Sequence, residues 1–251
     1  MAILDEIRRF WDDDAARYDD SPGHRPTSAA VQAAWTAALA GLLPPPPARV
    51  LDCGAGTGFL SLIAARLGHR VTALDLSPGM LAKLGAAADA EGLDVAVVVA
   101  PAHEPPDGFD AVMERHVLWT LPDPLATLRA WRQAAPTGRL VAVESMWGDA
   151  DPVEALRGRG RQWLRRLRGE ADDHHGPYPG DVRAALPLGT GTHPRAVTEL
   201  VARAGWAVPR LVRLRDVEWA ASTELPFPER LLGVAPRFAV VADTSRAGSP
   251  R

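Results

Sequence analysis

The sequence predicts an α/β fold built on a doubly wound, mostly parallel sheet of seven strands. Short apolar runs alternate with helical segments over residues 48–145, as in chains of parallel strands joined by helices. These runs lack polar alternation, which is typical of strands covered on both faces. A glycine-rich turn, "DCGAGTG", follows the first run. The regular pattern stops after Glu144 and resumes near residue 191, which predicts an inserted helical cap.

Residues 1–47 are predicted to be mainly helical. A helix over 2–18 precedes a polar loop at 19–26, "DDSPGHRP". Thr27 is then expected to cap an amphipathic helix that ends before the four prolines at 44–47.

Residues 48–145 are predicted to form the core of the fold. Two pairs, Ser77-Pro78 and Asp123-Pro124, have the residue types preferred at an N-cap and at the first helical position. The pattern predicts strands over 48–53, 69–76, 94–100, 108–116 and 138–145, and helices over 59–68, 77–90 and 124–135.

Residues 191–251 are predicted to complete the sheet, with a helix over 192–206 and strands over 210–220 and 237–243. The segment 146–190 contains an arginine-rich stretch and a polar loop, "ADDHHGPYPG". We interpret 146–190, and also 220–233, as insertions over the carboxyl edge of the sheet, where open α/β sheets bind ligands. The predicted units are therefore 1–47, 48–145, a cap at 146–190, and 191–251.

Composition and charge exclude several classes of protein. The chain has 251 residues, of which 47% are apolar and 24% charged, as in ordinary globular domains. A formal net charge of −3 does not favour a nucleic-acid or membrane partner, and no stretch is apolar enough to cross a bilayer. The run "RGRGRQWLRRLR" is interpreted as a solvated helix face. The single cysteine, Cys53, excludes an internal disulfide framework and fits a reducing cytoplasm. The chain is expected to be a monomer or a homodimer.

The glycine turn distinguishes between two cofactors. A dinucleotide fingerprint, G-x-G-x-x-G, that starts at Gly54 needs a glycine at position 59, where the chain has Phe59. The third glycine is Gly58 instead, and this argues against a nicotinamide oxidoreductase. The resulting G-x-G-x-G resembles the motif of class I S-adenosylmethionine-dependent methyltransferases.

Three further stretches extend this resemblance over roughly residues 10–145. Asp75 ends the second strand, where the family carries the acid that binds the ribose hydroxyls. "FDAVMERHVLWTLPDP" resembles the family's fourth-strand motif, and "FWDDDAARYDD" resembles the N-terminal helix that closes over the cofactor. The chain departs from the family at Pro101, where an acidic residue often accepts the adenine amino group.

The resemblance implies a Rossmann-like fold, S-adenosylmethionine as the cofactor, and N-terminal helices that cover it. Because Pro101 has no acceptor side chain, adenine recognition is assigned either to the backbone near Ala102 and His103 or to the side chain of His103 or Glu104. The predicted cofactor-binding residues are Tyr18, Asp52, Gly54, Ala55, Gly56, Gly58, Asp75, Leu76, Met80, Ala102, His103 and Arg115.

Methyl transfer requires an acceptor held in line with the methyl group and, for a hydroxyl or a protonated amine, a base. His116 and Glu114 follow the fourth strand, and His175 lies in the cap, so these three are the catalytic candidates. No metal is predicted, although the adjacent histidines and acids of the cap are residue types that can ligate a metal. The predicted substrate-binding residues are Trp11, Trp119, Glu144, His174 and Tyr178.

The sequence therefore predicts a methyltransferase that acts on an oxygen or nitrogen of a small molecule, as natural-product enzymes of secondary metabolism do. Two alternatives stay open. An enzyme of this fold can bind the cofactor and catalyse a reaction without methyl transfer, such as a cyclisation, and a non-catalytic partner subunit can retain the fold.

Overall fold

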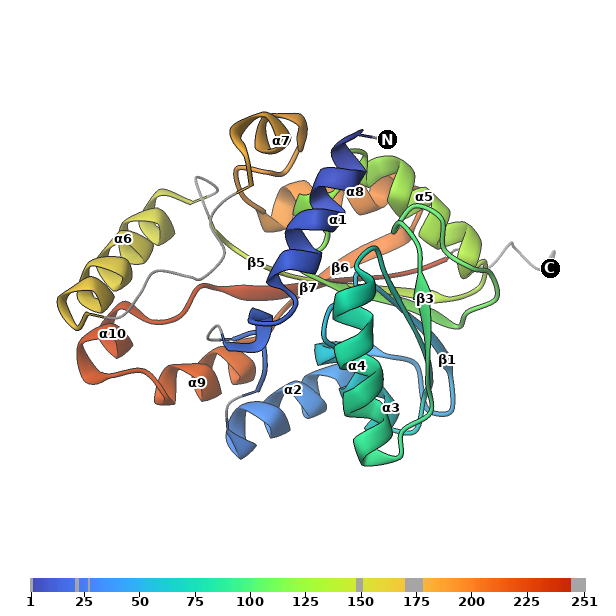
Figure 1. Ribbon diagram of the computed structural model, residues 1–251, viewed down its shortest axis with the longest axis horizontal. Coiled ribbons are helices and arrows are strands. Elements are labelled where there is room, and N and C mark those ends of the chain that lie inside the picture. The colour runs from blue at the N-terminus through green and yellow to red at the C-terminus, as the bar shows by residue number, and fades with distance from the viewer. Residues whose placement is uncertain (1, 21–22, 27, 148–150, 170–177, 245–251) are drawn as a thin grey trace.

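The structure is a computed structural model that describes residues 2–20, 23–26, 28–147, 151–169 and 178–244. Its centre is a seven-stranded sheet with the strand order β3-β2-β1-β4-β5-β7-β6 (Figure 1). Neighbouring strands from β3 to β5 pair in parallel, and β7 pairs antiparallel with both β5 and β6. The strands are β1 (Arg49–Cys53), β2 (Arg70–Asp75), β3 (Val95–Val99), β4 (Ala111–Arg115), β5 (Arg139–Ser145), β6 (Ala207–Arg213) and β7 (Arg237–Asp243).

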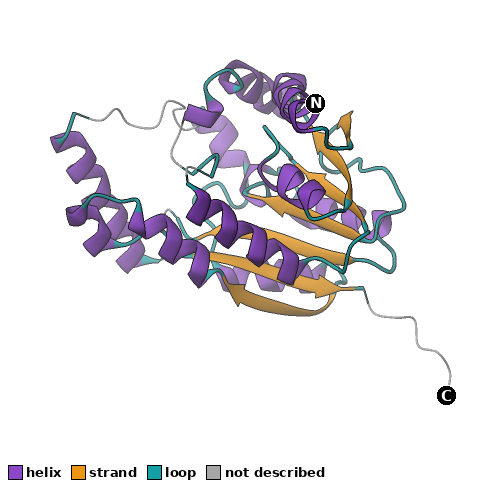
Figure 2. Ribbon diagram, turned by 90° about the horizontal axis from the view of Figure 1, so that it is seen from below, coloured by secondary structure: helices purple, strands orange, loops and turns teal. Residues whose placement is uncertain are grey.

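Helices cover both faces of this sheet, so the predicted doubly wound α/β fold is confirmed (Figure 2). On one face, α2 (Ala29–Leu42), α3 (Phe59–Arg66) and α9 (Arg215–Thr223) bury apolar side chains against the strands. On the other face, α5 (Pro124–Ala134) and α8 (Pro194–Arg203) do the same. The helix α4 (Pro78–Glu91) packs against β2 and β3.

The predicted helix caps explain where two helices of the core begin. Ser77 accepts the Met80 N–H at the start of α4, and Asp123 accepts the Ala126 N–H at the start of α5, each with proline in the first turn. The N-cap of α2 is Ser28, whose hydroxyl accepts the Val31 N–H, rather than Thr27, which lies outside the described residues.

The third strand differs from the prediction of full burial. β3 is an edge strand, and its Val97 and Val99 side chains are 48% and 57% exposed. Its apolar run therefore reflects β propensity rather than burial on both faces.

The strand predicted over 210–220 was wrong in its second half. β6 ends at Arg213, and α9 starts at Arg215. Val217 and Ala220, three residues apart, are both buried in the core beside α2, a spacing that places them on one face of a helix.

The remaining helices lie around the carboxyl edge. α1 (Ala2–Asp14) contacts α4 and α7 (Gly180–Ala185), and a short helix, η1 (Tyr18–Asp20), follows it. α6 (Pro152–Leu167) packs against α10 (Phe227–Leu232), beside α9 in Figure 1. The helix predicted over 2–18 ends earlier than expected, at Asp14. The helix α2 buries Trp35 and Leu39 and is part of the hydrophobic core. The unit boundaries at 47, 145 and 190 stay predictions.

Candidate functional site

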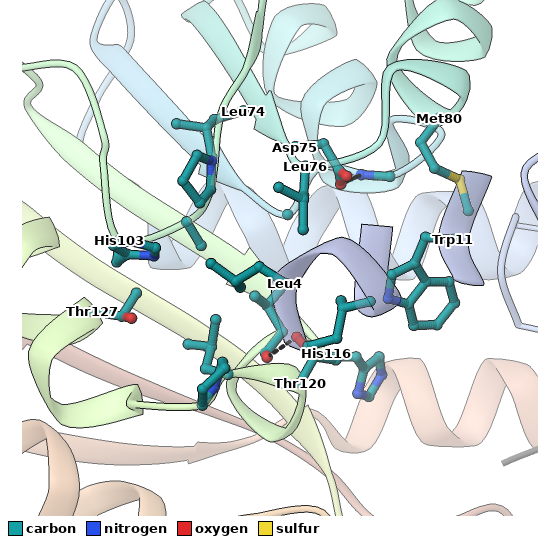
Figure 3. A pocket seen from close by; sticks show the side chains of 18 of the residues that line it. Leu4, Trp11, Leu74, Asp75, Leu76, Met80, His103, His116, Thr120 and Thr127 are labelled. Atoms are coloured by element: carbon teal, nitrogen blue, oxygen red, sulfur yellow. Dashed lines mark hydrogen bonds between the residues drawn. The ribbon is translucent and has the colours of Figure 1, made fainter. Parts of the chain in front are cut away.

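A cavity of about 370 Å³ lies at the carboxyl ends of β1, β2 and β4, under α1 (Figure 3). This volume is within the range of small-molecule sites in proteins. The location follows from the topology, because β1 lies between β2 and β4 and the chain runs outward from β1 in both directions. Of the predicted cofactor residues, the cavity is lined by Tyr18, Gly54, Gly56, Asp75, Leu76, Met80, Ala102, His103 and Arg115.

The three glycines of the turn adopt left-handed backbone angles, with φ values of 67°, 55° and 97° at Gly54, Gly56 and Gly58. A Cβ atom at Gly54 would lie 2.3 Å from Val117 Cγ2, so this glycine is needed for packing. At Gly56 the nearest atom would be 4.0 Å away, on the Tyr18 ring, so a side chain there would enter the cavity. Gly56 is thus the position where the backbone is open to a ligand.

Asp75 joins this turn to the start of α4. Its Oδ2 atom accepts the Gly56 N–H at 2.8 Å, and its Oδ1 atom accepts the Ser77 N–H at 2.8 Å. Burial raises the pKa of Asp75, and the Ser77 and Gly56 N–H groups act against that shift. Each carboxylate oxygen has a second lone pair, so the side chain can accept further hydrogen bonds from a ligand in the cavity.

The helix α1 is held in place by a carboxylate that the sequence analysis missed. Asp12 Oδ1 accepts hydrogen bonds from the Ser77 hydroxyl at 2.5 Å and from the Gly79 N–H at 3.2 Å. Downstream of α1, Asp19 accepts a bond of 2.6 Å from the Thr57 hydroxyl, next to the glycine turn. These contacts position α1 over the cavity. Its spacing of apolar residues was a usable signal, because the cavity is lined by Ile3, Leu4 and Ile7.

The opposite wall comes from the segment after β3. Pro101, Ala102 and His103 line the cavity, and the Trp131 indole N–H donates to the Ala102 carbonyl at 2.7 Å. That bond fixes the backbone at the position where the family's acid is missing. The sequence analysis also missed a group of lining residues that follow β4, namely Thr120, Leu121, Pro122, Asp123, Ala126 and Thr127.

Arg115 extends from the end of β4 into the same cavity. Its guanidinium lies 3.8 Å from the centre of the Phe59 ring and donates to the Gly23 carbonyl at 3.1 Å. Burial lowers the pKa of Arg115, while nearby Tyr18 and Asp52 act in the opposite direction.

His116 lines the cavity from the residue after β4 and has a left-handed φ of 61°, unusual for a residue with a side chain. Its Nδ1 atom lies 3.3 Å from Glu144 Oε2. Burial, and the positive charges of Arg115, Arg237 and His24, hold the pKa of His116 well below its usual value. The imidazole is therefore neutral at physiological pH.

Two carboxyl groups lie in the protein interior near His116, behind the cavity wall. Glu114 and Glu144 are both fully buried and do not line the cavity. Glu114 Oε2 accepts the Val117 N–H at 2.8 Å, and each of the two residues has an Oε1 atom without a hydrogen-bond partner among the described residues. Burial raises the pKa of Glu114 to about 8 and also raises that of Glu144. Glu114 is therefore a support for the loop after β4 rather than a group at the cavity surface.

Replacing Glu114 with glutamine is expected to flatten the dependence of stability on pH. The folded-state pKa lies above the unfolded value of about 4.3, so the Glu114 contribution to stability is lost as pH rises through about 8. Glutamine cannot ionise and can still accept the Val117 N–H. Between about pH 5 and pH 9, the wild type should lose on the order of 3 kcal/mol more unfolding free energy than Glu114→Gln, measured by denaturant titration.

The control for this measurement is Glu104→Gln, because the Glu104 side chain is 68% exposed. This variant should follow the wild type at every pH. Parallel curves for the wild type and Glu114→Gln would contradict the assignment of a buried, proton-holding carboxyl at position 114.

Several predicted site residues lie behind or beside the cavity. Asp52 is buried, accepts the Ser61 hydroxyl at 2.6 Å, and has a pKa raised to about 7 by that burial. Gly58 begins α3, where a Cβ atom would meet Leu84 Cγ at 2.7 Å. The predicted ligand contacts that the structure places outside the cavity lining are Asp52, Ala55, Gly58, Glu114, Trp119, Glu144 and Tyr178.

An aromatic cluster adjoins the cavity instead. The Trp11 indole N–H, from a residue that lines the cavity, donates to the Tyr178 hydroxyl at 2.7 Å. The Trp119 ring is 5.3 Å from that of Tyr178 and 5.2 Å from that of Trp147. His174 and His175 lie outside the described residues, and the part of the chain that the structure describes contains no group of three potential metal ligands.

Comparison with known proteins adds the following findings. Residues 51–142 match the family model of a methyltransferase domain. Over 147 residues the chain is 35% identical to a ubiquinone biosynthesis O-methyltransferase of Xanthomonas campestris pv. campestris (strain B100). This match covers 56% of the chain and 61% of that relative. The corresponding protein of Xanthomonas oryzae pv. oryzae (strain PXO99A) is 36% identical over 146 residues, 55% of the chain and 60% of the relative.

Solved structures show the same fold at low sequence identity. Phospholethanolamine N-methyltransferase 2 of Haemonchus contortus, in complex with phosphomonomethylethanolamine and S-adenosylhomocysteine, has a TM-score of 0.63 at 15% identity, covering 98% of the chain and 61% of that protein. Magnesium protoporphyrin IX methyltransferase of Synechocystis PCC 6803 with bound S-adenosylhomocysteine has a TM-score of 0.59 at 16% identity, covering 97% of the chain and all (100%) of that protein. No helix of the described residues is long and apolar enough to cross a membrane.

Proposed function

We propose that the chain is a class I methyltransferase that uses S-adenosylmethionine to methylate a hydroxyl oxygen of a small molecule. The chain covers about three fifths of the relatives it matches, so the acceptor is inferred from the site and from their O-methyltransferase names. As in the natural-product enzymes that the sequence resembles, we assign the reaction to the biosynthesis of a small molecule.

The residues of the cavity fit this cofactor. The open space at Gly56 accommodates a ligand close to the backbone, and the free lone pairs of Asp75 suit the two hydroxyls of a ribose. Leu76 and Met80 offer apolar surface for adenine, beside the backbone at Ala102. Arg115 lines the cavity near Gly54 and Gly56 and suits the carboxylate of the methionine portion. When bound, the cofactor supplies an electrophilic methyl group on a sulfonium.

His116 is the proposed base. With its proton on Nδ1, directed at Glu144, the neutral imidazole keeps a lone pair on Nε2. That atom can accept the proton of an acceptor hydroxyl while the oxygen attacks the methyl carbon. The α1 residues Ile3, Leu4 and Ile7 give this cavity an apolar wall. Glu144 is a positioning residue, since it orients the imidazole from below.

The single observation that carries this proposal is that His116 lines the same cavity as Asp75 and Gly56, at a place where burial and positive charges lower its pKa. A general base is required for a hydroxyl, whose proton must leave, and is dispensable for an amine that is already neutral. This is why we favour oxygen over nitrogen.

The experiment is a reaction of the purified chain with S-adenosylmethionine and a panel of phenols, alcohols and amines, analysed by product mass. A methylated phenol or alcohol, together with S-adenosylhomocysteine, supports the proposal. A methylated amine alone would contradict the choice of oxygen. Conversion of an acceptor without the gain of a methyl group would instead support the alternative of a cyclisation or similar reaction.

Replacing Arg237 with glutamine is expected to move the acid limb of the pH–rate profile to higher pH. Arg237 is one of the positive groups that lower the pKa of His116, and its Nη1 atom has no hydrogen-bond partner among the described residues. Removing this charge raises the pKa of His116, so the base form is lost at a higher pH. The acid limb of kcat/KM against pH measures the shift, with the exposed Arg203→Gln as control. An unmoved limb in Arg237→Gln would assign the limb to another group.

A further inference from the structure

The helix α6 presents its apolar side to solvent. Val153, Leu156, Trp163 and Leu167 are 58%, 64%, 61% and 64% exposed. Their spacing of three, seven and four residues places them on one face of the helix. We call these four residues the α6 apolar face. A surface helix of a globular protein normally buries such a face against the core.

The opposite, charged side of α6 is the side that packs inward. The buried Glu154 pairs with Arg161, seven residues or about two helical turns later. Arg168 pairs with the buried Glu229 of α10. Arg161 also donates to the Gly233 carbonyl at 2.9 Å. The arginine-rich run, expected to be a solvated face, is thus partly an inward-facing ion-pair network. This network fixes the orientation of α6 with its apolar face outward.

Exposed apolar side chains continue on the neighbouring helices. Phe227 and Leu231 of α10 are 72% and 74% exposed, and Trp219 of α9 is 70% exposed. α10 packs against α6, and the three helices lie together at one end of the molecule (Figure 1). Large apolar side chains gathered in this way on a chain of mixed composition mark an interaction surface.

Arginines flank the α6 apolar face. With about 100° of rotation per residue, Arg159 and Arg166 fall on one side of it and Arg157 on the other. All three are exposed residues, whereas Arg168 is engaged by Glu229. The whole chain has a net charge of −3, so this local positive charge is a property of the helix and not of the protein.

We propose that the α6 apolar face binds the surface of a membrane that contains anionic phospholipids. A helix with a tryptophan and leucines on one side and arginines on both flanks can lie in the plane of the interface, with its apolar side among the acyl chains and its guanidinium groups at the phosphates. Such binding needs no membrane-crossing helix. The sequence-based exclusion of a membrane considered only net charge and crossing length, and neither describes this helix.

Charge argues against a second copy of the chain as the occupant. In a symmetric dimer the same surface meets itself, so the flanking arginines of the two copies would be brought together. Like charges placed in this way destabilise an interface, whereas an anionic bilayer complements them.

The test is co-sedimentation of the full chain with phospholipid vesicles. We expect binding to vesicles of phosphatidylcholine with about 30% phosphatidylglycerol, and much weaker binding to pure phosphatidylcholine or at about 0.5 M salt. Leu156→Ser with Leu167→Ser should lower the partition coefficient by about tenfold or more. Arg157→Gln with Arg159→Gln should lower it by about 30-fold.

Matched controls come from other surfaces of the chain. Val99→Ser with Leu211→Ser, and Arg129→Gln with Arg203→Gln, change exposed aliphatic residues and exposed arginines away from α6 and should leave binding unchanged. Lipids brominated in the acyl chain should quench tryptophan fluorescence, and Trp163→Phe should remove much of that quenching. Circular dichroism of each variant shows that it is folded.

Two results would overturn the proposal. One is the absence of binding to anionic vesicles at low salt, or binding that the two α6 double variants do not weaken. The other is a concentration-dependent dimer, measured by light scattering, that Leu156→Ser with Leu167→Ser abolishes. That second result would assign the α6 apolar face to contact between copies of the chain.

Discussion

Replacing His116 with asparagine is expected to lower kcat by a factor of about 10²–10⁴ while leaving the affinity for S-adenosylhomocysteine unchanged. The imidazole lines the cavity and is neutral, because burial and nearby positive charges lower its pKa. Asparagine tolerates the left-handed backbone angle of this position better than alanine does, so the loss reports on the missing base rather than on backbone strain. Single-turnover rates and calorimetry separate the two quantities.

Glu144→Gln is the matched variant, because it retains the shape of the group next to His116 Nδ1. It should lower kcat less than His116→Asn does and shift the pH dependence, as expected for a residue that positions another. The competing base, His175, is tested in the double variant His116→Asn with His175→Ala, since losses at independent sites add. Near-normal turnover in both variants over about pH 6–9 would contradict a histidine base. The acceptor would then need positioning alone.

Asp75→Ala is expected to weaken the binding of S-adenosylhomocysteine by roughly 10- to 150-fold. Losing hydrogen bonds to a charged acceptor costs about 1.5–3 kcal/mol, and about 1.4 kcal/mol corresponds to tenfold in affinity. The carboxylate lines the cavity between the glycine turn and α4. Titration calorimetry measures the loss directly.

Asp75 also accepts hydrogen bonds from the Gly56 and Ser77 N–H groups. Its removal can therefore weaken binding in two ways, by losing the contact with the ligand and by destabilising the glycine turn. Changing the ligand separates these effects. The affinity for 5′-methylthioadenosine is compared with the affinity for its analogue that lacks the ribose 2′-hydroxyl. The wild type should discriminate between the two ligands, and Asp75→Ala should not. Equal discrimination by both proteins would show that Asp75 does not contact the ribose. Glu104→Ala, whose side chain is exposed beside the site, is the control.

The sequence predicted the caps of α4 and α5 and the glycine turn correctly, because these features depend on residues that are close together in the chain. Ser77-Pro78 and Asp123-Pro124 begin helices as expected, because an N-cap oxygen and a proline act within one turn of the chain. The glycine turn was equally readable, since Gly54 and Gly58 both require left-handed angles and leave no room for a Cβ atom. Their role in packing, against Val117 and Leu84, was not readable, because those neighbours are distant in sequence.

The errors have a different origin. The apolar run of β3 looks the same whether a strand is central or at an edge, and strand order is a property of the whole sheet. Residues 215–220 were assigned to a strand although Val217 and Ala220 have helical spacing. Glu114 and Glu144 look like site residues because they follow strands, yet their side chains point into the interior, where only the surrounding packing reveals their burial. Asp12 was missed because its partners, Ser77 and Gly79, lie on another helix.

The attachment of α1 at Ser77 and Gly79 has a thermodynamic consequence. Asp12 bonds to the first turn of α4, two to four residues beyond Asp75, and α1 forms one wall of the cavity. Detachment of α1 removes part of the binding surface, so the free energy of its docking is part of the affinity for any molecule held there. By reciprocity, an occupant of the cavity must stabilise the docked helix by the same amount. Amide protons of residues 2–14 would then exchange more slowly with solvent deuterium when the cavity is filled, although most of them touch no ligand.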